Sequence, residues 1–239
     1  MLMKDFVKQF REYDLDPKKL ATKPNVILCS SWGAAKARED SPKIKPTEFV
    51  IHHMATQNRP NFSGTESAIL AGEKLAKDCQ KMHMTPGKNN PLTPDGASDT
   101  GQHLTLTIDG ILLEGRHGSG YALLNGWDCP KGAQCYGHND NTFGMEHEGN
   151  FMDCIPNIVQ MKVSLTVSAW FAMTRNLDSH SAFHGHRERV ATGCPGDAFE
   201  SLIWNSDKTS GAYLNKVHDI IVEMKKIWSK NDQGNWVEK

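Results

Sequence analysis

Two runs rich in apolar and β-branched residues, HLTLTI at 103–108 and ILLEGR at 111–116, are separated only by Asp109-Gly110. An Asp-Gly pair between such runs is a strong signal for a tight turn that joins two antiparallel strands. Any sheet that this chain forms is therefore expected to contain one antiparallel pair of neighbouring strands.

Strand-like and helix-like segments alternate on both sides of this hairpin. Further strands are expected at 25–28, 47–56, 142–149 and 181–186. Helical apolar spacing predicts helices within 4–21 and at 65–82, 155–177, 197–205 and 211–229. The segments 85–101 and 117–141 are expected to be irregular. Strands alternating with helices predict an α/β fold in which helices flank a mixed central β-sheet.

The length of 239 residues allows one substantial core, and we expect a single main domain. Its expected bounds are 26–205, after an N-terminal helical extension at 1–25 whose role the sequence does not indicate. The last part, 206–239, predicts a helix that packs on the domain, followed by a polar tail.

Charge and hydropathy narrow the classes of partner. Lys and Arg total 27 against 28 Asp and Glu, so no strong electrostatic field favours nucleic acid or an anionic membrane. The start, MLMKDFVKQFREYDLDP, lacks the apolar run of a signal peptide, and no later stretch approaches the ~20 apolar residues of a membrane span. We therefore expect a protein made in the cytoplasm, without a membrane span, that acts as a monomer.

Histidines and a cysteine suggest a metal site. His184, His186 and Cys194 lie close together in FHGHRERVATGCPGDAF, where either histidine could reach a metal from an extended segment. A zinc site needs at least three protein ligands. In the expected strand around His52 and His53, alternation turns these two side chains to opposite faces, so only one of them can face such a site.

The remaining cysteines do not indicate a disulfide pattern. The chain has six, too widely spaced for a small disulfide scaffold. Cys129 and Cys135 could close a short disulfide loop, and two reduced thiols fit the spacing equally well. A zinc knuckle would need a second Cys or His pair at matching spacing, and none is present.

Four stretches together resemble a known family: SSWGAAKARE with FVIHHMAT, TGQHLTLTIDGILLEGR, FGMEHEGN, and GHRERVATGCPG. Their order is similar to that in the zinc-dependent N-acetylmuramoyl-L-alanine amidases of the phage-lysozyme and peptidoglycan recognition protein superfamily, over about residues 30–205. The resemblance implies that family's fold, Zn²⁺ as cofactor, and bacterial peptidoglycan or muropeptides as partner. The implied reaction is hydrolysis of the amide that joins N-acetylmuramic acid to L-alanine.

The resemblance also implies roles for single residues. His52, His186 and Cys194 become the zinc ligands, and a water takes the fourth position. Glu146 becomes the general base. Thr192 becomes a group that orients the water or donates to the developing oxyanion. Glu148, which alternation places on the same strand face as Glu146, is the alternative base.

One departure from the family concerns the residues before the hairpin. Where many relatives have Gly-Tyr-His or Gly-Tyr-Asn, this chain has Gly101-Gln102-His103, and Gln102 cannot act as a phenol. Catalysis then depends more on Glu146, or His103 or another group takes over the task. We assign Gln102 and His103 to substrate binding.

Other functions are compatible with parts of the pattern. A non-catalytic peptidoglycan-binding module is the main alternative, but such modules usually lack the cysteine ligand that Cys194 supplies. A structural zinc site would need His184 as a fourth ligand. The P-C-x-x-C of nucleobase deaminases and the H-E-x-x-H of zincins are both absent. Among biological settings, we favour a bacteriolytic endolysin released through a membrane pore over a delivered toxin or a cytoplasmic muropeptide-recycling enzyme.

Overall fold

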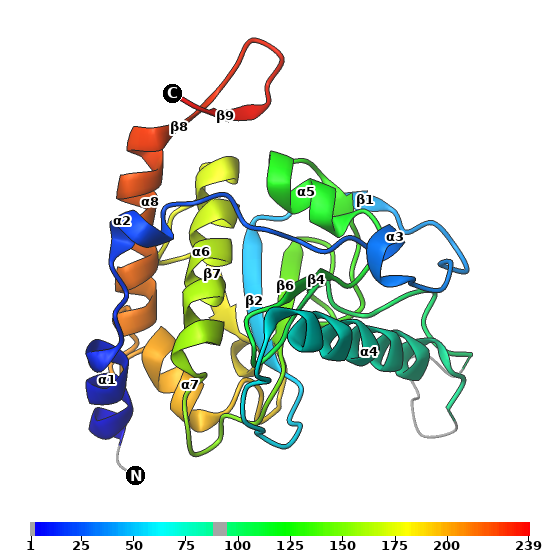
Figure 1. The fold of residues 1–239 in the computed structure, drawn as a ribbon, viewed down its shortest axis with the longest axis horizontal. Coiled ribbons are helices and arrows are strands. Elements are labelled where there is room, and N and C mark those ends of the chain that lie inside the picture. The colour runs from blue at the N-terminus through cyan, green and yellow to red at the C-terminus, as the bar shows by residue number, and fades with distance from the viewer. Residues whose placement is uncertain (1–2, 88–94) are drawn as a thin grey trace.

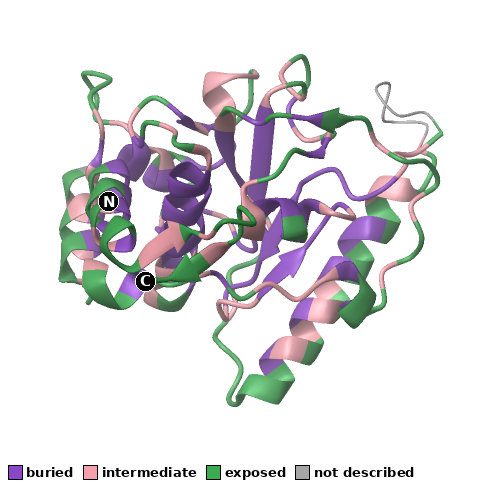
Figure 2. Cartoon of the chain, turned by 90° about the horizontal axis from the view of Figure 1, so that it is seen from above, coloured by how far each residue is buried: buried purple, intermediate pink, exposed green. Residues whose placement is uncertain are grey.

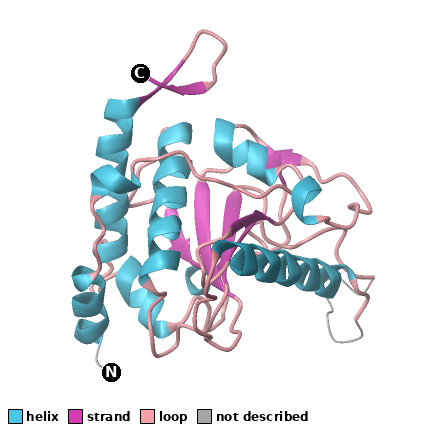
Figure 3. Ribbon diagram, in the orientation of Figure 1, coloured by secondary structure: helices cyan, strands magenta, loops and turns pink. Residues whose placement is uncertain are grey.

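The computed structural model describes residues 3–87 and 95–239, so part of the loop expected at 85–101 lies outside the described residues. A five-stranded sheet in the order β4-β3-β6-β2-β7 forms its centre (Figures 1 and 3). The strands are β2 (Glu48–His53), β3 (Leu104–Leu106), β4 (Leu112–Glu114), β6 (Thr142–His147) and β7 (Phe183–Gly185). Only the pairing of β3 with β4 is antiparallel in this sheet, as the Asp-Gly turn predicts. The prediction of a mixed sheet is confirmed.

Helices cover both faces of the sheet. On one face, α6 (Ile158–Arg175) packs on apolar side chains of β2, and Phe49 contacts Phe171 edge to face. On the other face, α4 (Thr65–Met84) and α3 (Cys29–Trp32) pack around Leu113 of β4. Because α4 covers only the β3–β4 side, the face of β2 and β6 that carries His52 and Glu146 keeps an open pocket.

The N-terminal segment shares the core of the main domain. Helices α1 (Met3–Glu12) and α2 (Pro17–Leu20) pack on α7 (Asp197–Ile203) and α8 (Ala212–Ile227), respectively (Figure 1). Buried apolar side chains of α1, α2 and the turn between them belong to the same cluster as those of α6 and the sheet: Phe6, Phe10, Leu15 and Leu20. Figure 2 shows buried segments in the central sheet and in the helices around it. Residues 3–25 therefore contribute to the main core.

Two expected segments differ from the structure. The strand expected at 25–28 is a single bridge between Ile27 and Leu113, because α3 begins at Cys29. The segment 117–141 contains α5 (Ser119–Asn125), a helix that left-handed Gly118 and Gly126 confine to two turns, too short for a clear periodic signal. It also contains β5 (Cys129–Pro130), which pairs with β1 (Lys43–Ile44).

The expected polar tail forms a small hairpin. Strand β8 (Trp228–Lys230) pairs with β9 (Trp236–Glu238). The rings of Trp228 and Trp236 both contact Trp170 of α6 at steep angles. Two aromatic side chains thus attach a segment that is otherwise rich in polar residues.

No helix within residues 3–87 or 95–239 combines the length and apolar character that crossing a membrane requires.

Candidate metal centre and catalytic pocket

Three metal-ligating side chains from two distant parts of the chain meet beside the carboxyl end of β2. His52 lies on β2, His186 begins a 3₁₀ turn after β7, and Cys194 follows the next loop. One ligand atom of each residue lies within 4.8 Å of the other two. Among the residues that the structure describes, no other group of three or more His, Cys, Asp or Glu side chains meets so closely.

Gln134 determines which nitrogen of His52 faces this group. The hydroxyl of Thr142 donates to the carbonyl of His138 (2.7 Å), so it accepts from the Gln134 side-chain amide nitrogen (2.9 Å). The Gln134 amide oxygen then faces Nε2 of His52 and accepts its N–H. Nδ1 is left unprotonated, 3.7 Å from the Cys194 sulfur. Such a partner on the far ring nitrogen is how proteins orient metal-binding histidines.

The loop between His186 and Cys194 is closed on itself. The Arg187 backbone N–H donates to the Cys194 carbonyl (2.9 Å), and the Arg187 guanidinium donates to Asp197 (2.6 Å) and to the Gly193 carbonyl. The Cys194 sulfur accepts from the backbone N–H of His53 at 3.3 Å. These contacts bring two residues eight positions apart to one point beside β2.

The protonation chemistry of the three groups fits a bound zinc ion. Burial lowers the pKa values of His52 and His186, so both imidazoles are neutral at neutral pH, which is the form that binds metals. Burial raises the pKa of the Cys194 thiol to about 12. A thiolate at this depth therefore needs a cation beside it. Two neutral imidazoles and one thiolate are a set of donors that suits Zn²⁺ and leaves its fourth position open.

Glu146 lies next to the same group. It is directly opposite His52 in the register of the parallel strands β2 and β6. Its side chain lines, with the three possible ligands, a pocket of about 220 Å³. Burial raises the pKa of its carboxyl group to about 7, and it makes no ion pair or hydrogen bond with any described residue. A carboxyl group that titrates near neutrality is suited to accept a proton and to return it.

Gln102 lines the pocket, whereas Thr192 is not among the described residues that do so. Gln102 is buried in the pocket wall, where its amide nitrogen donates to Thr105 (3.0 Å) and to the sulfur of Cys79 (3.2 Å). Thr192 is exposed, its hydroxyl accepts from the backbone N–H of Cys194 (3.3 Å), and it is not among the described residues that line the pocket.

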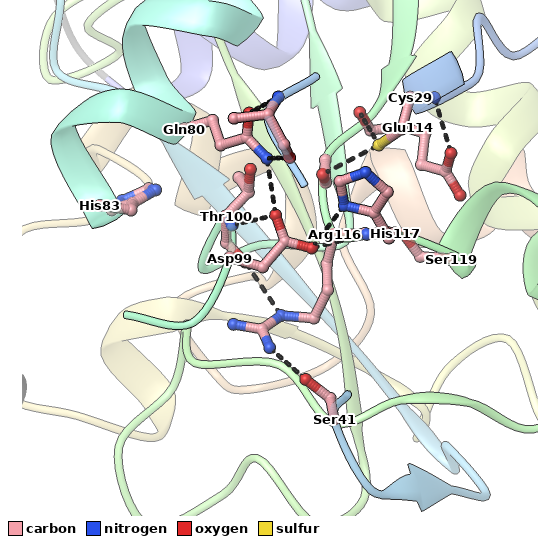
Figure 4. Close-up of polar contacts among 12 residues, drawn as sticks. Cys29, Ser41, Gln80, His83, Asp99, Thr100, Glu114, Arg116, His117 and Ser119 are labelled. Carbon is pink, nitrogen blue, oxygen red and sulfur yellow. Dashed lines mark hydrogen bonds and ion pairs between the residues drawn. The ribbon is translucent and has the colours of Figure 1, made fainter. Parts of the chain in front are cut away.

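A buried carboxylate holds the wall segment that carries Gln102. Asp99 accepts from the Gln80 amide (2.8 Å), from the Thr100 backbone (2.8 Å) and from both the backbone and the ring of His117 (2.9 Å each), as Figure 4 shows. The Arg116 guanidinium donates to the Thr100 carbonyl (2.9 Å). This network joins α4 to the segments before β3 and after β4.

The structure corrects two sequence-based assignments near the pocket. Glu148, the alternative base, lies beyond the end of β6, where it pairs with Arg59 (2.8 Å) and accepts from the Ile108 backbone (2.9 Å). His103 is fully buried, with Nε2 2.9 Å from the Pro130 carbonyl and Nδ1 accepting from the Gly144 backbone (2.9 Å). Since both ring nitrogens are used inside the protein, His103 supports the sheet, and it is not among the described residues that line the pocket.

Two other expectations at this site are also settled. His184 does not share a face with His186, because β7 ends at Gly185 and His186 turns away. The His184 ring instead lies 3.3 Å from Glu188 and 2.6 Å from Arg189, so it is not a fourth ligand. Cys129 and Cys135 are both free thiols and form no disulfide loop.

Sequence reasoning missed two residues of the pocket. Gln134 falls in the segment expected to be irregular, and only its contact with His52 reveals its role. A side chain at Gly144 would lie 2.6 Å from Gln134, so this glycine permits the approach. His83, at the end of α4, also lines the pocket, and its Nδ1 accepts from the Gly101 backbone (3.3 Å).

Comparison with known proteins places the chain in a family. A family model described as N-acetylmuramoyl-L-alanine amidase matches residues 42–197, more than half of the chain and inside the expected domain. The chain belongs to this amidase family. It is 29% identical over 175 residues to the N-acetylmuramoyl-L-alanine amidase of Sus scrofa, a match that covers 72% of this chain and 25% of that protein. The chain thus spans about a quarter of the length of the mammalian amidases it matches.

Recognition proteins are also among its relatives. Peptidoglycan-recognition protein SC2 of Drosophila simulans is 24% identical over 185 residues, covering 77% of this chain and 85% of that protein. The crystal structure of Drosophila peptidoglycan recognition protein SD has a TM-score of 0.59 at 21% identity, covering 78% of this chain and 97% of that one. This likeness confirms the expected fold, and the family match confirms the expected family.

Proposed function

We propose that this protein is a zinc-dependent N-acetylmuramoyl-L-alanine amidase that hydrolyses the bond between N-acetylmuramic acid and L-alanine in peptidoglycan. The observation that carries the proposal is the position of Glu146, a half-buried carboxyl group without a described partner in the same pocket as His52, His186 and Cys194. A pocket that only bound peptidoglycan would have no need of an unpaired acid beside three metal-ligating groups.

His52, His186 and Cys194 are the residues that would hold the ion. When bound, zinc with an open fourth position lowers the pKa of a water molecule and polarises an amide carbonyl. Gln134 keeps the His52 ring in the orientation and tautomer that ligation needs.

Glu146 would move the protons of the reaction. Its carboxylate takes a proton from the attacking water, and the resulting acid gives a proton to the leaving nitrogen of L-alanine. No described side chain pairs with this carboxyl group, so its oxygens remain available for both proton transfers. The Thr192 hydroxyl, whose proton no described contact uses, is proposed as a weak donor to the oxyanion.

Gln102 is proposed to contact substrate from the pocket wall. A carboxamide can donate and accept hydrogen bonds but cannot transfer a proton as a phenol does. The proton transfers of the reaction are therefore assigned to Glu146 alone, and loss of this group should be more damaging than loss of Gln102.

The proposal is tested with a soluble muramyl peptide, zinc-loaded protein and the variants Glu146→Gln and Gln102→Ala. Free muramic acid derivatives and peptides with a new N-terminal alanine should form with the wild-type protein. Glu146→Gln should lose at least about 100-fold in kcat, and Gln102→Ala should mainly raise KM. Tight binding of the muramyl peptide without any cleavage would reject the amidase and favour a recognition module.

The biological setting is proposed to be bacteriolytic. We also propose that the protein acts as a monomer. We favour an endolysin acting on polymeric cell wall after release from the cytoplasm. A recycling enzyme would instead prefer soluble muropeptides, so the ratio of activities on intact wall and on soluble fragments separates the two settings.

A further inference from the structure

A second cavity of about 370 Å³ lies away from the catalytic pocket, and the two share no lining residue. It is bounded by the first turns of α4, the middle of α6, the turn between β3 and β4, and residues 19–27, which cross α6 on their way to α3 (Figure 1). Its volume is in the range of pockets that bind small molecules.

The cavity has an apolar interior that is open to solvent. Half-buried side chains from three different elements face it: Ile69, Ile111 and Val163. Leu20 and Leu112 extend this apolar surface into the buried core. An aliphatic group of a ligand would cover these side chains and remove their remaining apolar area from water.

The charged lining is of one sign. Lys19, Lys23 and Lys162 line the cavity, and no Asp or Glu does so among the described residues. Lys162 is half-buried on α6 and makes no ion pair or hydrogen bond with any residue the structure describes. The Lys23 ammonium lies 5.8 Å from the centre of the Trp170 ring, two helical turns along α6 from Lys162. Among the residues that the structure describes, Lys19 pairs only with the solvent-exposed Asp14 (3.4 Å), which is a weak interaction.

One wall of the cavity is outside the part of the chain that matches the amidase family. Residues 19–27 supply two of the three lysines, whereas the family match begins at residue 42. The cavity is therefore a property of this chain's N-terminal segment packed on the family fold.

We propose that this cavity binds a small amphiphile with an aliphatic chain and an anionic carboxylate or phosphate head group. The chain lies against Ile69, Ile111 and Val163, and the head group pairs with the ammonium of Lys162, while Lys19 and Lys23 add positive charge elsewhere along the lining. Long lysine stems allow the charges to reach the head group while their methylenes cover the chain. The site is independent of the amidase reaction.

The test measures binding to the full-length protein by isothermal titration calorimetry, below the micelle concentration of each probe. The probes are dodecanoate and dodecyl phosphate, with dodecyltrimethylammonium as a cation of equal chain length. Saturable binding of either anion at one site, with at least about tenfold weaker binding of the cation, is expected. The stronger anion identifies the head-group chemistry.

Two variants locate the site. Lys162→Met keeps most of the side-chain volume, removes the unpaired charge and should weaken binding of the anion about fivefold. Ile69→Trp fills the apolar interior from a half-exposed position on α4 and should weaken binding at least about tenfold. Lys74 lies on α4, as Ile69 does, and outside the cavity. Lys74→Met is therefore the control for loss of a lysine charge and should bind the anion as tightly as the wild-type protein does.

Circular dichroism and cleavage of a muramyl peptide accompany each variant. Unchanged cleavage by Lys162→Met is expected, so failure of this proposal would be distinct from failure of the amidase proposal. If neither anion binds saturably, if the cation binds equally well, or if Lys162→Met binds as tightly as Lys74→Met, the proposal is wrong. If Ile69→Trp unfolds, the comparison of Lys162→Met with Lys74→Met still decides whether the proposal holds.

Discussion

Among single residues, Cys194 gives the most direct evidence that the three side chains form a metal site. Its sulfur lies 3.7 Å from Nδ1 of His52 and accepts from the His53 backbone. We expect Cys194→Ser to lose most of its zinc, because a hydroxyl is a far poorer zinc ligand than a thiolate. Zinc content after gel filtration, measured by atomic absorption, checks this. Cys154→Ser, at a half-buried cysteine outside the donor group, should keep its metal, and full zinc occupancy in Cys194→Ser would exclude the site.

A variant of Glu146 can separate zinc binding from catalysis of the cleavage. Glu146→Gln should bind zinc with the wild-type stoichiometry and lose at least about 100-fold in kcat, because the amide cannot accept a proton. The same zinc assay and a turnover assay check the two parts. The exposed Glu66→Gln is the control and should keep both properties. Turnover in Glu146→Gln within a few-fold of the wild-type rate would assign the base to another group.

Part of this residue-level arrangement is predictable from sequence. Alternation along one strand separates His52 from His53, and the structure places only His52 in the donor group. Alternation also places Glu148 on the same face as Glu146, and this prediction is wrong because β6 ends before Glu148. Gln134 could not be found in this way, since its role depends on a contact across 82 positions of the chain.

At the scale of elements, α1 and α2 are parts of the core. Phe10 of α1 is 3% exposed and packs in the cluster that also contains α6 and α8. We expect Phe10→Ala to lower the free energy of unfolding by about 3 kcal/mol. Urea denaturation checks this, and the exposed Phe62→Ala should cost about 0.5 kcal/mol or less. If Phe10→Ala has no larger effect than Phe62→Ala, the N-terminal helices are a dispensable extension.

Helix α7 carries a buried carboxyl group that should make stability depend on pH. Both oxygens of Glu200 are buried without a partner among the described residues, and burial raises the pKa of this group to about 7. Between the unfolded pKa of about 4.3 and the folded value, only the folded state holds the proton, so stability falls as pH rises through this window and stays low above it.

Glu200→Gln removes this titration. The melting temperature of the variant relative to wild type should therefore be higher at about pH 8 than at about pH 5. Differential scanning calorimetry measures both, and Glu66→Gln should show no such pH dependence. A difference between Glu200→Gln and wild type that stays constant across this range would contradict the buried, unpaired state of Glu200.

The elements themselves are predictable where the pattern is long or the turn is specific. The helix at 65–82, the helix at 155–177 and the hairpin at Asp109-Gly110 all form where the sequence places them. Helix α5 was not predicted because seven residues between two glycines give too few turns for a periodic signal. The hairpin at the C-terminus depends on Trp170, a tertiary contact that local sequence does not reveal.

For the whole molecule, the mixed sheet brings two histidines, a cysteine and a glutamate from three distant segments into one pocket. The family fold alone does not decide between catalysis and recognition, because its relatives include both amidases and recognition proteins. The donor group and the isolated Glu146 favour catalysis.

The intact protein is proposed to cleave the amide at N-acetylmuramic acid with a metal held by this pocket. The most direct measurement is a digest of purified peptidoglycan with zinc-loaded and chelator-stripped protein, with the products resolved by mass spectrometry and by assay of new amino termini. We predict zinc-dependent release of peptides that begin with L-alanine, without new reducing sugar ends. Intact wall with protein bound to it, in the presence of zinc, would contradict the claim.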